Sequence, residues 1–239
     1  KPNIVRQQTK YATFQAAAAV TPGFSGAFIS EPQIKLGSVV QFPEDKAVTQ
    51  FDRVILTCPS NAAEKMLTDL DPTERKLLRG IRYQGIVCAS VMLKCSLSDY
   101  YVTNITDDTP FTGIIEMSAI VDKEEFNNNA LVYLPRYVAP DDELFDKTDD
   151  EIEKIFLDAL EQMYADFKGS DVVTFKIWRV RQVFPIPVVD YSTELSGMKS
   201  SVDGVHVVNS SHIVNGTLNI NETVQLAERF FREDAAGAK

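Results

Sequence analysis

Histidine and cysteine are scarce in this chain, which limits the metal and redox chemistry that its own side chains can perform. The 239 residues include two histidines, His206 and His212, and three cysteines. Cys58, Cys88 and Cys95 lie in apolar surroundings, and their spacing lacks the pairs that a zinc site uses. A metal centre is therefore not expected, and the odd number of cysteines favours a reducing compartment, the cytoplasm.

Positive charge is also in deficit. Lysine and arginine number 24 against 34 aspartates and glutamates, which gives a formal net charge of −10. Such a surface repels nucleic-acid phosphates and anionic lipid heads, and no local basic cluster offsets it. No apolar run is long enough to cross a bilayer, and no apolar leader precedes the four N-glycosylation sequons. A soluble cytoplasmic protein without a nucleic-acid partner is expected.

Sequence signatures of two large enzyme classes are missing as well. The chain contains no G-x-x-x-x-G-K-[ST] loop, no G-x-G-x-x-G loop and no G-x-S-x-G turn. Loops of the first two kinds bind phosphates through backbone amides, and the third presents a nucleophilic serine. A dinucleotide site complete within this chain is therefore excluded, and a serine hydrolase is disfavoured.

Strand-type segments alternate with polar turns along most of the chain. The pattern predicts strands at 33–42, 54–57, 85–94, 111–121, 130–136, 172–183 and 204–208. Those between 85 and 136 are expected to form an antiparallel meander. The fold class is therefore mixed α/β (α+β), with long antiparallel strands in a mixed sheet and helices packed on it. Residues 1–32 show no sustained period in the spacing of their apolar residues.

Cap residues mark the expected helix starts. Four polar residues precede segments with helical apolar spacing: Ser60, Asp71, Thr148 and Asn219. An amphipathic helix packs through its apolar stripe. In the last helix this stripe is predicted to be Ile220, Val224, Ala227 and Phe231.

The stretch from Gly204 to Val224 is the most informative one. It is typical of a buried strand, a loop rich in asparagine and serine, a Gly-Thr pair and a helix start. The first amides of a helix are unpaired and lie at the positive end of its dipole, which favours an anionic or electron-rich ligand. A capped helix after a surface loop explains the same pattern, so the residues alone leave both interpretations open.

This arrangement resembles the C-terminal part of the FAD-dependent amine oxidase and protoporphyrinogen oxidase superfamily. There, a strand ending in Gly-Asp or Gly-Glu precedes a glycine-containing helix start whose amides face the pyrimidine side of the flavin. Asn209-Ser210 departs from that Gly-Asp, and residues 216–219 match the helix start. The resemblance implies FAD as cofactor. It implies cofactor contacts at Val39, Cys58, Asn209, Ser210, Gly216, Thr217, Leu218 and Asn219.

Two earlier segments match the superfamily in order. Residues 51–63 resemble its block of an aspartate, an apolar strand and a proline, and residues 34–42 resemble the strand before it, whose backbone contacts the adenine end of FAD. The resemblance implies that 33–59 and 204–234 are pieces of an FAD-binding domain and that 60–203 is the substrate domain. It also implies that the family's N-terminal βαβ unit lies before Lys1, so this portion alone is expected to be inactive.

Five residues of the implied substrate domain are candidates for substrate contact: Glu116, Arg136, Tyr137, Arg179 and Tyr191. Arginine binds carboxylates and phosphates bidentately, and tyrosine offers an apolar wall with a polar tip. Cross-strand pairs on a half-exposed sheet explain the same residues. Trp178 is expected in the core.

The resemblance implies an FAD-dependent oxidoreductase that removes a hydride equivalent from a small organic substrate, with no side chain assigned as catalytic. A flavin-dependent isomerase similar to UDP-galactopyranose mutase is an alternative, in which Arg136, Arg179 and Arg181 would bind a diphosphate. A non-catalytic interaction module is a further alternative if the chain is complete. The oligomeric state stays open.

Overall fold

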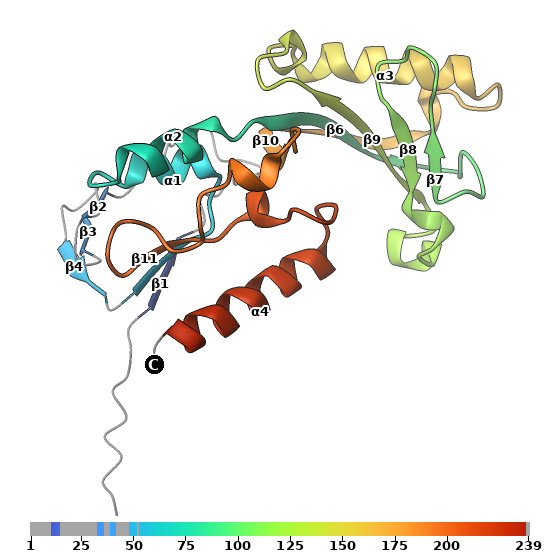
Figure 1. Ribbon diagram of the computed structural model, residues 1–239. Helices are drawn as coiled ribbons and strands as arrows, with labels where there is room; N and C mark the ends of the chain where they lie inside the picture. The colour runs from blue at the N-terminus through green and yellow to red at the C-terminus, as the bar shows by residue number, and fades with distance from the viewer. Residues whose placement is uncertain (1–10, 15–32, 36–38, 42–47, 52, 238–239) are drawn as a thin grey trace, which may run out of the picture. The chain divides into compact units, whose positions relative to one another are not determined.

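The chain folds into two compact units. The computed structural model describes residues 11–14, 33–35, 39–41, 48–51 and 53–237 (Figure 1). The first unit combines the described parts of 1–82 and 184–239, and the second is 83–183. The sequence-based division differs from this one, because 60–82 and 184–203 cluster with the first unit and not with the proposed substrate domain.

A parallel sheet is the centre of the first unit. Its order is β1 (Tyr11–Phe14), β5 (Arg53–Leu56) and β11 (Val205–Val207). The central strand pairs in parallel with both neighbours, and Val54 lies opposite Val205. All three residues of β11 are buried, which agrees with the short buried strand that the sequence predicts at 204–208.

A second sheet in this unit corrects one strand prediction. Strands β2 (Gln33–Lys35), β3 (Val39–Gln41) and β4 (Val48–Gln50) form it in that order. Since β2 pairs antiparallel with β3, residues 33–42 do not form one continuous strand. Apolar alternation continues through a hairpin, so the periodicity alone could not show where the chain reverses.

Helices cover both faces of the parallel sheet. In Figure 1, α1 (Ser60–Met66) and α2 (Pro72–Gly80) lie on one side of β5 and β11, and α4 (Ile220–Gly237) lies on the other. Leu56 and its same-face neighbours pack with α1 and α2 in one core cluster. A smaller cluster on the opposite face joins Ile55 to α4.

The predicted buried stripe of α4 is wrong. The residues that pack on the sheet are Leu226 and Phe230, and the Phe230 ring meets His206 edge-on, with ring centroids 5.1 Å apart. All four residues of the predicted stripe are exposed, including Phe231 at 57%. The helix is therefore apolar on two faces, and only the sheet decides which of them is buried.

Three of the four predicted helix caps are confirmed. The Asp71 side chain accepts from the amides of Thr73 and Glu74, and Thr148 forms a capping box with Glu151. The Asn219 side chain accepts from the amide of Glu222. Ser60 does not cap α1, which starts after Pro59 without a side-chain cap. The Ser60 hydroxyl instead joins a buried network described below.

The second unit is a five-stranded sheet. Its strands are β6 (Tyr83–Leu93), β7 (Val102–Asn104), β8 (Gly113–Glu116), β9 (Ala130–Val138) and β10 (Val172–Pro185). The order is β10-β6-β9-β8-β7, so the predicted meander is corrected: β6 pairs with β9 and not with the strand that follows it in sequence. Strand pairing across such a loop depends on tertiary contacts that local spacing does not contain.

Helix α3 (Asp149–Met163) closes one face of this sheet (Figure 1). Its buried residues Ile152, Phe156 and Leu160 enter the largest core cluster of the protein's described residues. The rings of Phe111 and Phe156 meet edge-on with centroids 5.4 Å apart. The apolar period of this helix, read from the sequence, therefore identifies its packed face correctly.

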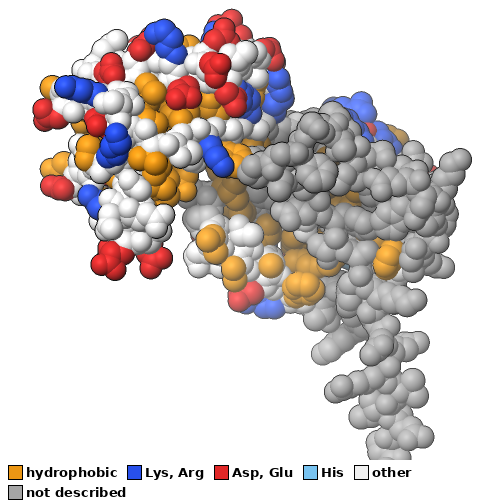
Figure 2. All heavy atoms as spheres, turned by 180° about the vertical axis from the view of Figure 1, so that it is seen from behind, with side chains coloured by type: hydrophobic (Ala, Val, Ile, Leu, Met, Phe, Trp, Pro, Cys, Tyr) orange, Lys and Arg blue, Asp and Glu red, His pale blue; other side chains and the backbone are white. Residues whose placement is uncertain are grey.

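Charge is mixed on the surface of the second unit, and acidic and basic side chains are interspersed on the face that Figure 2 shows. None of the helices in the described residues combines the length and the apolar composition that a membrane crossing requires. The described residues also contain no group of three or more histidine, cysteine, aspartate or glutamate side chains placed to hold a metal ion.

Truncation of the α3 core should unfold the second unit preferentially. Replacing the fully buried Phe156 by alanine should lower the free energy of unfolding by about 3–5 kcal/mol, because it leaves a cavity beneath the sheet. The adjacent Ile155 is 37% exposed, and Ile155→Ala should cost less than about 1 kcal/mol. Urea titration followed by fluorescence of Trp178, the chain's one tryptophan, reports on this unit. Equal losses in the two variants would contradict the packing.

Candidate functional site

The carboxyl ends of β5 and β11 meet at one edge of the parallel sheet. The two strands run in the same direction, and β5 leads to Cys58 while β11 leads to Asn209. In open α/β sheets, ligands bind outside the carboxyl ends of the strands, because loops and helix starts converge there. This edge is therefore the candidate cofactor site of the first unit.

The side chain of Asn209 joins the two strand ends. Its Nδ2 donates to the carbonyl of Cys58 at 2.7 Å and to Ser60 Oγ at 3.2 Å. Its Oδ1 accepts from Ser211 twice, from the amide at 2.9 Å and from Oγ at 2.6 Å. Both ends of this buried carboxamide are thus bonded within the protein. Asn209 can shape the loop but does not offer its amide group to a ligand.

A second group of bonds fixes the short 3₁₀ helix that follows Asn209, residues Ser210–His212. The Tyr191 hydroxyl donates to the Ser211 carbonyl at 3.0 Å, and the hydroxyls of Ser60 and Ser211 lie 3.1 Å apart. Arg229 of α4 donates to the His212 carbonyl at 2.9 Å. Three separate segments therefore hold this turn, which makes the loop to α4 a fixed structure at its origin.

His212 is buried among main-chain groups. Its Nε2 lies 3.3 Å from the Ser196 carbonyl, and its Nδ1 lies 3.4 Å from the Asn209 amide. Burial lowers the pKa of His212, bonds to the Asn209 and Ser196 carbonyls raise it in part, and the charge of Arg229 lowers it again. Burial also lowers the pKa of His206, together with the charges of Arg53 and Lys199. Both rings are therefore neutral at neutral pH.

The start of α4 is exposed but partly closed by its own side chains. Ile220, the first residue of the helix, is 84% exposed. Asn219 Oδ1 accepts the Glu222 amide at 2.9 Å, while no acceptor within the described residues bonds the amides of Ile220 and Asn221. The Glu222 side chain lies against Gly216, where a β-carbon would come within 2.7 Å of Glu222 Cδ.

The predicted cofactor residues thus have different surroundings. Thr217 and Leu218 are exposed beside the start of α4, and Ser210 is half-buried at the sheet edge. Cys58 is fully buried with its thiol directed at Met66 Sδ, 4.0 Å away, so it can contribute only main-chain atoms to the edge. Val39 lies in β3 of the separate antiparallel sheet, opposite Lys35 and Gln50. The structure thus brings Cys58, Asn209 and Ser210 together.

The sheet of the second unit has an open face on the side opposite α3. Cross-strand neighbours share a face, and the residues of β6 that are half-exposed pair with β9 residues on that side. Trp178 of β10 donates from Nε1 to Ser90 Oγ at 3.1 Å, which places alternate residues of β10 there too. The open face includes Ile86, Cys88, Ser90, Met92, Leu131, Tyr133, Pro135, Tyr137, Lys176, Trp178 and Val180.

This open face is aromatic, sulfur-containing and nearly free of charge at its centre. Trp178 is half-buried on it, which corrects the expectation that this residue lies in the core. Burial raises the pKa of the Cys88 thiol to about 11, against a smaller lowering by a bond to the Leu134 backbone, so the thiol stays protonated. Burial alternates with period two along β6, but the strand is apolar on both faces, as Ile86 and Val87 show, so no alternation of polar and apolar residues in the sequence marks this face.

Of the five substrate candidates, only Tyr137 lies on the open face. Glu116 is buried, and its carboxylate accepts the amides of Leu97 and Ser98. Arg136 lies opposite Val87 on the α3 side and donates to a main-chain carbonyl. Tyr191 belongs to the first unit, where it bonds Ser211.

The remaining candidate, Arg179, serves the start of α3. Its guanidinium bonds Asp149 at 2.6 Å and the Lys147 carbonyl at 2.8 Å. Arg181 bonds Asp146 at 3.2 Å in the same way. These arginines therefore neutralise acidic residues of their own unit, and they do not converge with Arg136 as a diphosphate site would require.

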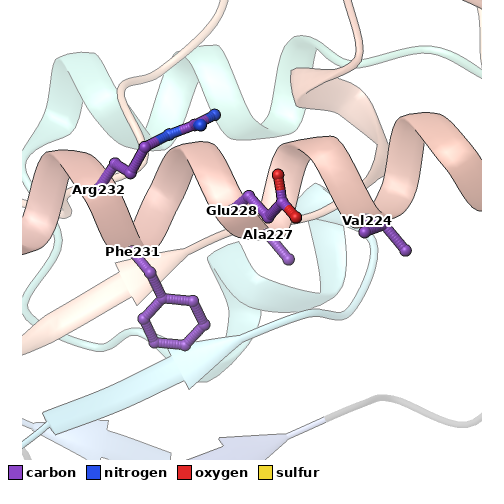
Figure 3. A pocket seen from close by; sticks show the side chains of 5 residues that line it. All are labelled: Val224, Ala227, Glu228, Phe231 and Arg232. Atoms are coloured by element: carbon purple, nitrogen blue, oxygen red, sulfur yellow. The ribbon is translucent and has the colours of Figure 1, made fainter.

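A shallow hollow lies along the outer side of α4. Figure 3 shows Val224, Ala227 and Phe231 directed to one side of the helix, with Glu228 and Arg232 beside them. All the residues that line it belong to this one helix. The hollow is thus a feature of the second apolar face of α4, separate from the sheet edge described above.

Residues 35–217 match the family model of flavin-containing amine oxidoreductases. The chain belongs to this family. The match spans the strand ends, their loops and the whole second unit, so it includes both the candidate cofactor edge and the open face. The superfamily resemblance predicted from residues 34–63 and 204–224 is thereby confirmed.

Solved structures show that the fold of this family extends over most of the chain. A candidate protoporphyrinogen oxidase from Exiguobacterium sp. matches with a TM-score of 0.63 at 12% identity, covering 84% of this chain and 45% of its own. Putrescine oxidase bound to putrescine matches with a TM-score of 0.63 at 12% identity, covering 95% of this chain and 48% of its own. Reduced UDP-galactopyranose mutase matches with a TM-score of 0.52 at 13% identity, covering 68% of this chain and 36% of its own. At these identities the likeness concerns the fold alone.

The chain thus spans less than half the length of these structures. No curated protein matches it by sequence. The mixed α/β fold class that the sequence predicted is confirmed by the same structures.

Removing the Asn209 carboxamide should loosen the sheet edge. Asn209→Ala leaves the Cys58 carbonyl and the Ser211 amide buried without their partner, which should cost about 3 kcal/mol of stability in the first unit. Asn219→Ala, which removes an exposed cap only ten residues away, should cost about 1 kcal/mol. Thermal unfolding followed by far-ultraviolet circular dichroism compares the two, and similar losses would show that Asn209 does not join the strands.

The first unit should lose stability in mild acid. Because the pKa of His212 is lowered in the folded state from its ordinary 6.5, the unfolded chain binds a proton more readily just below that pH. The contribution of the neutral His212 ring to the free energy of unfolding is complete above about pH 6.5, and it declines as the pH falls toward the folded-state pKa. His212→Gln should flatten this pH dependence of the melting temperature. An unchanged pH profile in the variant would assign the effect to other groups.

Proposed function

We propose that this protein oxidises a small organic substrate with FAD. The observation that carries the proposal is the match of residues 35–217 to a flavin-containing oxidoreductase family. When bound, the flavin of such an enzyme accepts a hydride equivalent, and the protein binds, orients and shields the reactants. The described residues of the open face include no carboxylate or imidazole, which suits a reaction whose redox step belongs to the cofactor.

The residues at the sheet edge fit an electron-rich ring in part. The amides of Ile220 and Asn221 are the groups that can support negative charge on a reduced flavin, since the Glu222 amide is already bonded to Asn219. Against this, the carboxylate of Glu222 beside Gly216 opposes negative charge at the same place. The flavin contact is therefore assigned to main-chain groups of residues 216–221, and Asn209 is a positioning residue for their loop.

The open face of the second unit is the proposed substrate surface. Its rings, Tyr133, Tyr137 and Trp178, favour a substrate with an apolar part, and its hydroxyl groups can orient a polar end. An isomerase acting on a nucleotide sugar is less well supported. The three arginines that it would need are bonded to aspartates and main-chain carbonyls of the second unit.

Removal of one amide at the helix start tests the proposed flavin contact. Ile220→Pro deletes the N–H at the first helical position, where proline is well tolerated, and Ile220→Ala keeps it. The protein purified from its natural source should carry flavin, seen by its visible absorption. The proline variant should bind the flavin more weakly or give it a more negative reduction potential, by the equivalent of about 1.5–3 kcal/mol. The alanine variant should behave like the natural protein.

Two outcomes would contradict these assignments. A natural protein that is colourless and stays colourless when FAD is added would overturn the oxidoreductase function and favour a non-catalytic module. A coloured protein in which the proline and alanine variants have equal flavin affinity and potential would keep the function and overturn the role of the α4 amides.

A further inference from the structure

The loop that leads into α4 contains the chain's one Asn-Gly pair, Asn215-Gly216. It lies between the 3₁₀ helix Ser210–His212 and the start of α4, outside regular secondary structure. Asn215 is exposed. Within the described residues, neither its carboxamide nor the Gly216 amide takes part in a hydrogen bond that would hold it in place. Both groups are therefore free to react with each other.

An asparagine followed by glycine can lose its amide without an enzyme. The Gly216 nitrogen attacks Asn215 Cγ and gives its proton to solvent, and the Cγ–Nδ2 bond breaks as Nδ2 takes up a proton from solvent and leaves as ammonia. A five-membered succinimide remains. One water molecule then opens this ring at either carbonyl, giving aspartate or isoaspartate, and no oxidant or reductant is consumed. Glycine favours the attack because no β-carbon obstructs the approach of its nitrogen.

We propose that Asn215 is a site of spontaneous deamidation and that the new carboxylate loosens the start of α4. The half-buried Glu222 side chain lies against Gly216, with Cγ and Oε2 each 2.9 Å from the position of a β-carbon there. A second carboxylate one residue away repels the Glu222 charge. Isoaspartate in addition lengthens the main chain by one carbon and displaces Gly216 from this contact.

The helix dipole does not compensate for that repulsion. Its attraction for an anion is confined to the first turn, and Asn215 lies four residues before the Asn219 cap. The modification therefore acts on the contact between Gly216 and Glu222 and not through stabilisation of the helix end. Neither the repulsion from Glu222 nor the longer main chain of isoaspartate depends on a bound flavin. The inference is therefore independent of the proposed function.

Two other asparagines provide controls within the same region. Asn221 is exposed like Asn215, but it lies in α4 and is followed by Glu222, whose side chain hinders the attack. Asn209 is buried, and its carboxamide is bonded to Cys58 and Ser211. The geometry therefore makes Asn215 the reactive one of the three.

Peptide mapping by mass spectrometry tests the first half of the proposal. The folded protein is incubated in mildly alkaline buffer beside a urea-unfolded sample, and conversion at residues 209, 215 and 221 is followed with time. Asn215 should convert in the folded protein at a rate within a few-fold of that in the unfolded chain, while Asn209 and Asn221 stay intact. Asn215→Gln, which would need a less favourable six-membered ring, should abolish the signal. Retention of the Asn215 amide in the folded protein alone would overturn the site.

Hydrogen exchange tests the second half. Asn215→Asp should speed amide exchange over residues 217–224 relative to the natural protein, and Asn215→Gln, which adds no charge, should leave it unchanged. Adding salt should reduce the difference, since it screens the repulsion between the two carboxylates. Equal exchange in the aspartate and glutamine variants would show that the new carboxylate does not affect the helix start.

Discussion

The joining of two parallel strand ends by one buried carboxamide is the constraint on which the candidate site depends. Asn209 bonds the Cys58 carbonyl after β5 and the Ser211 amide after β11, so it fixes the separation of both loops at the sheet edge. Since a buried amide must satisfy its donors and acceptors, this position tolerates few other side chains. The loop to α4 starts from that fixed point.

Helix α4 shows how a sheet selects one of two possible helix faces. Leu226 and Phe230 pack on Ile55 and His206, although the stripe that includes Val224 and Phe231 has equally regular spacing. A helix that is apolar on both sides is typical of one with structure on both sides. The outer face and its shallow hollow are therefore a distinct surface of the first unit (Figure 3).

In the second unit, the acidic start of α3 holds the arginines of β10 on one side of the sheet. Arg179 and Arg181 are drawn to Asp149 and Asp146 on the helix side, and Glu116 is used to bond a loop. These three charged residues thereby lie away from the opposite face, which carries rings, a thiol and hydroxyl groups. The strands do contain charged residues. The chemistry of the open face results from the ion pairs that Arg179 and Arg181 form on the other side of the sheet.

Local signals in the sequence determined the elements that depend on neighbouring residues. The capping box at Thr148 and Glu151, the Asp71 cap and the buried run of β11 need only short-range bonds and composition, and all are confirmed. The order of strands and loops was also sufficient to indicate the family. Tertiary structure decided the rest: the reversal between β2 and β3, the pairing of β6 with β9, the buried face of α4 and the partners of the arginines. Each of these depends on contacts between residues far apart in the chain, whose free energy is absent from any local pattern.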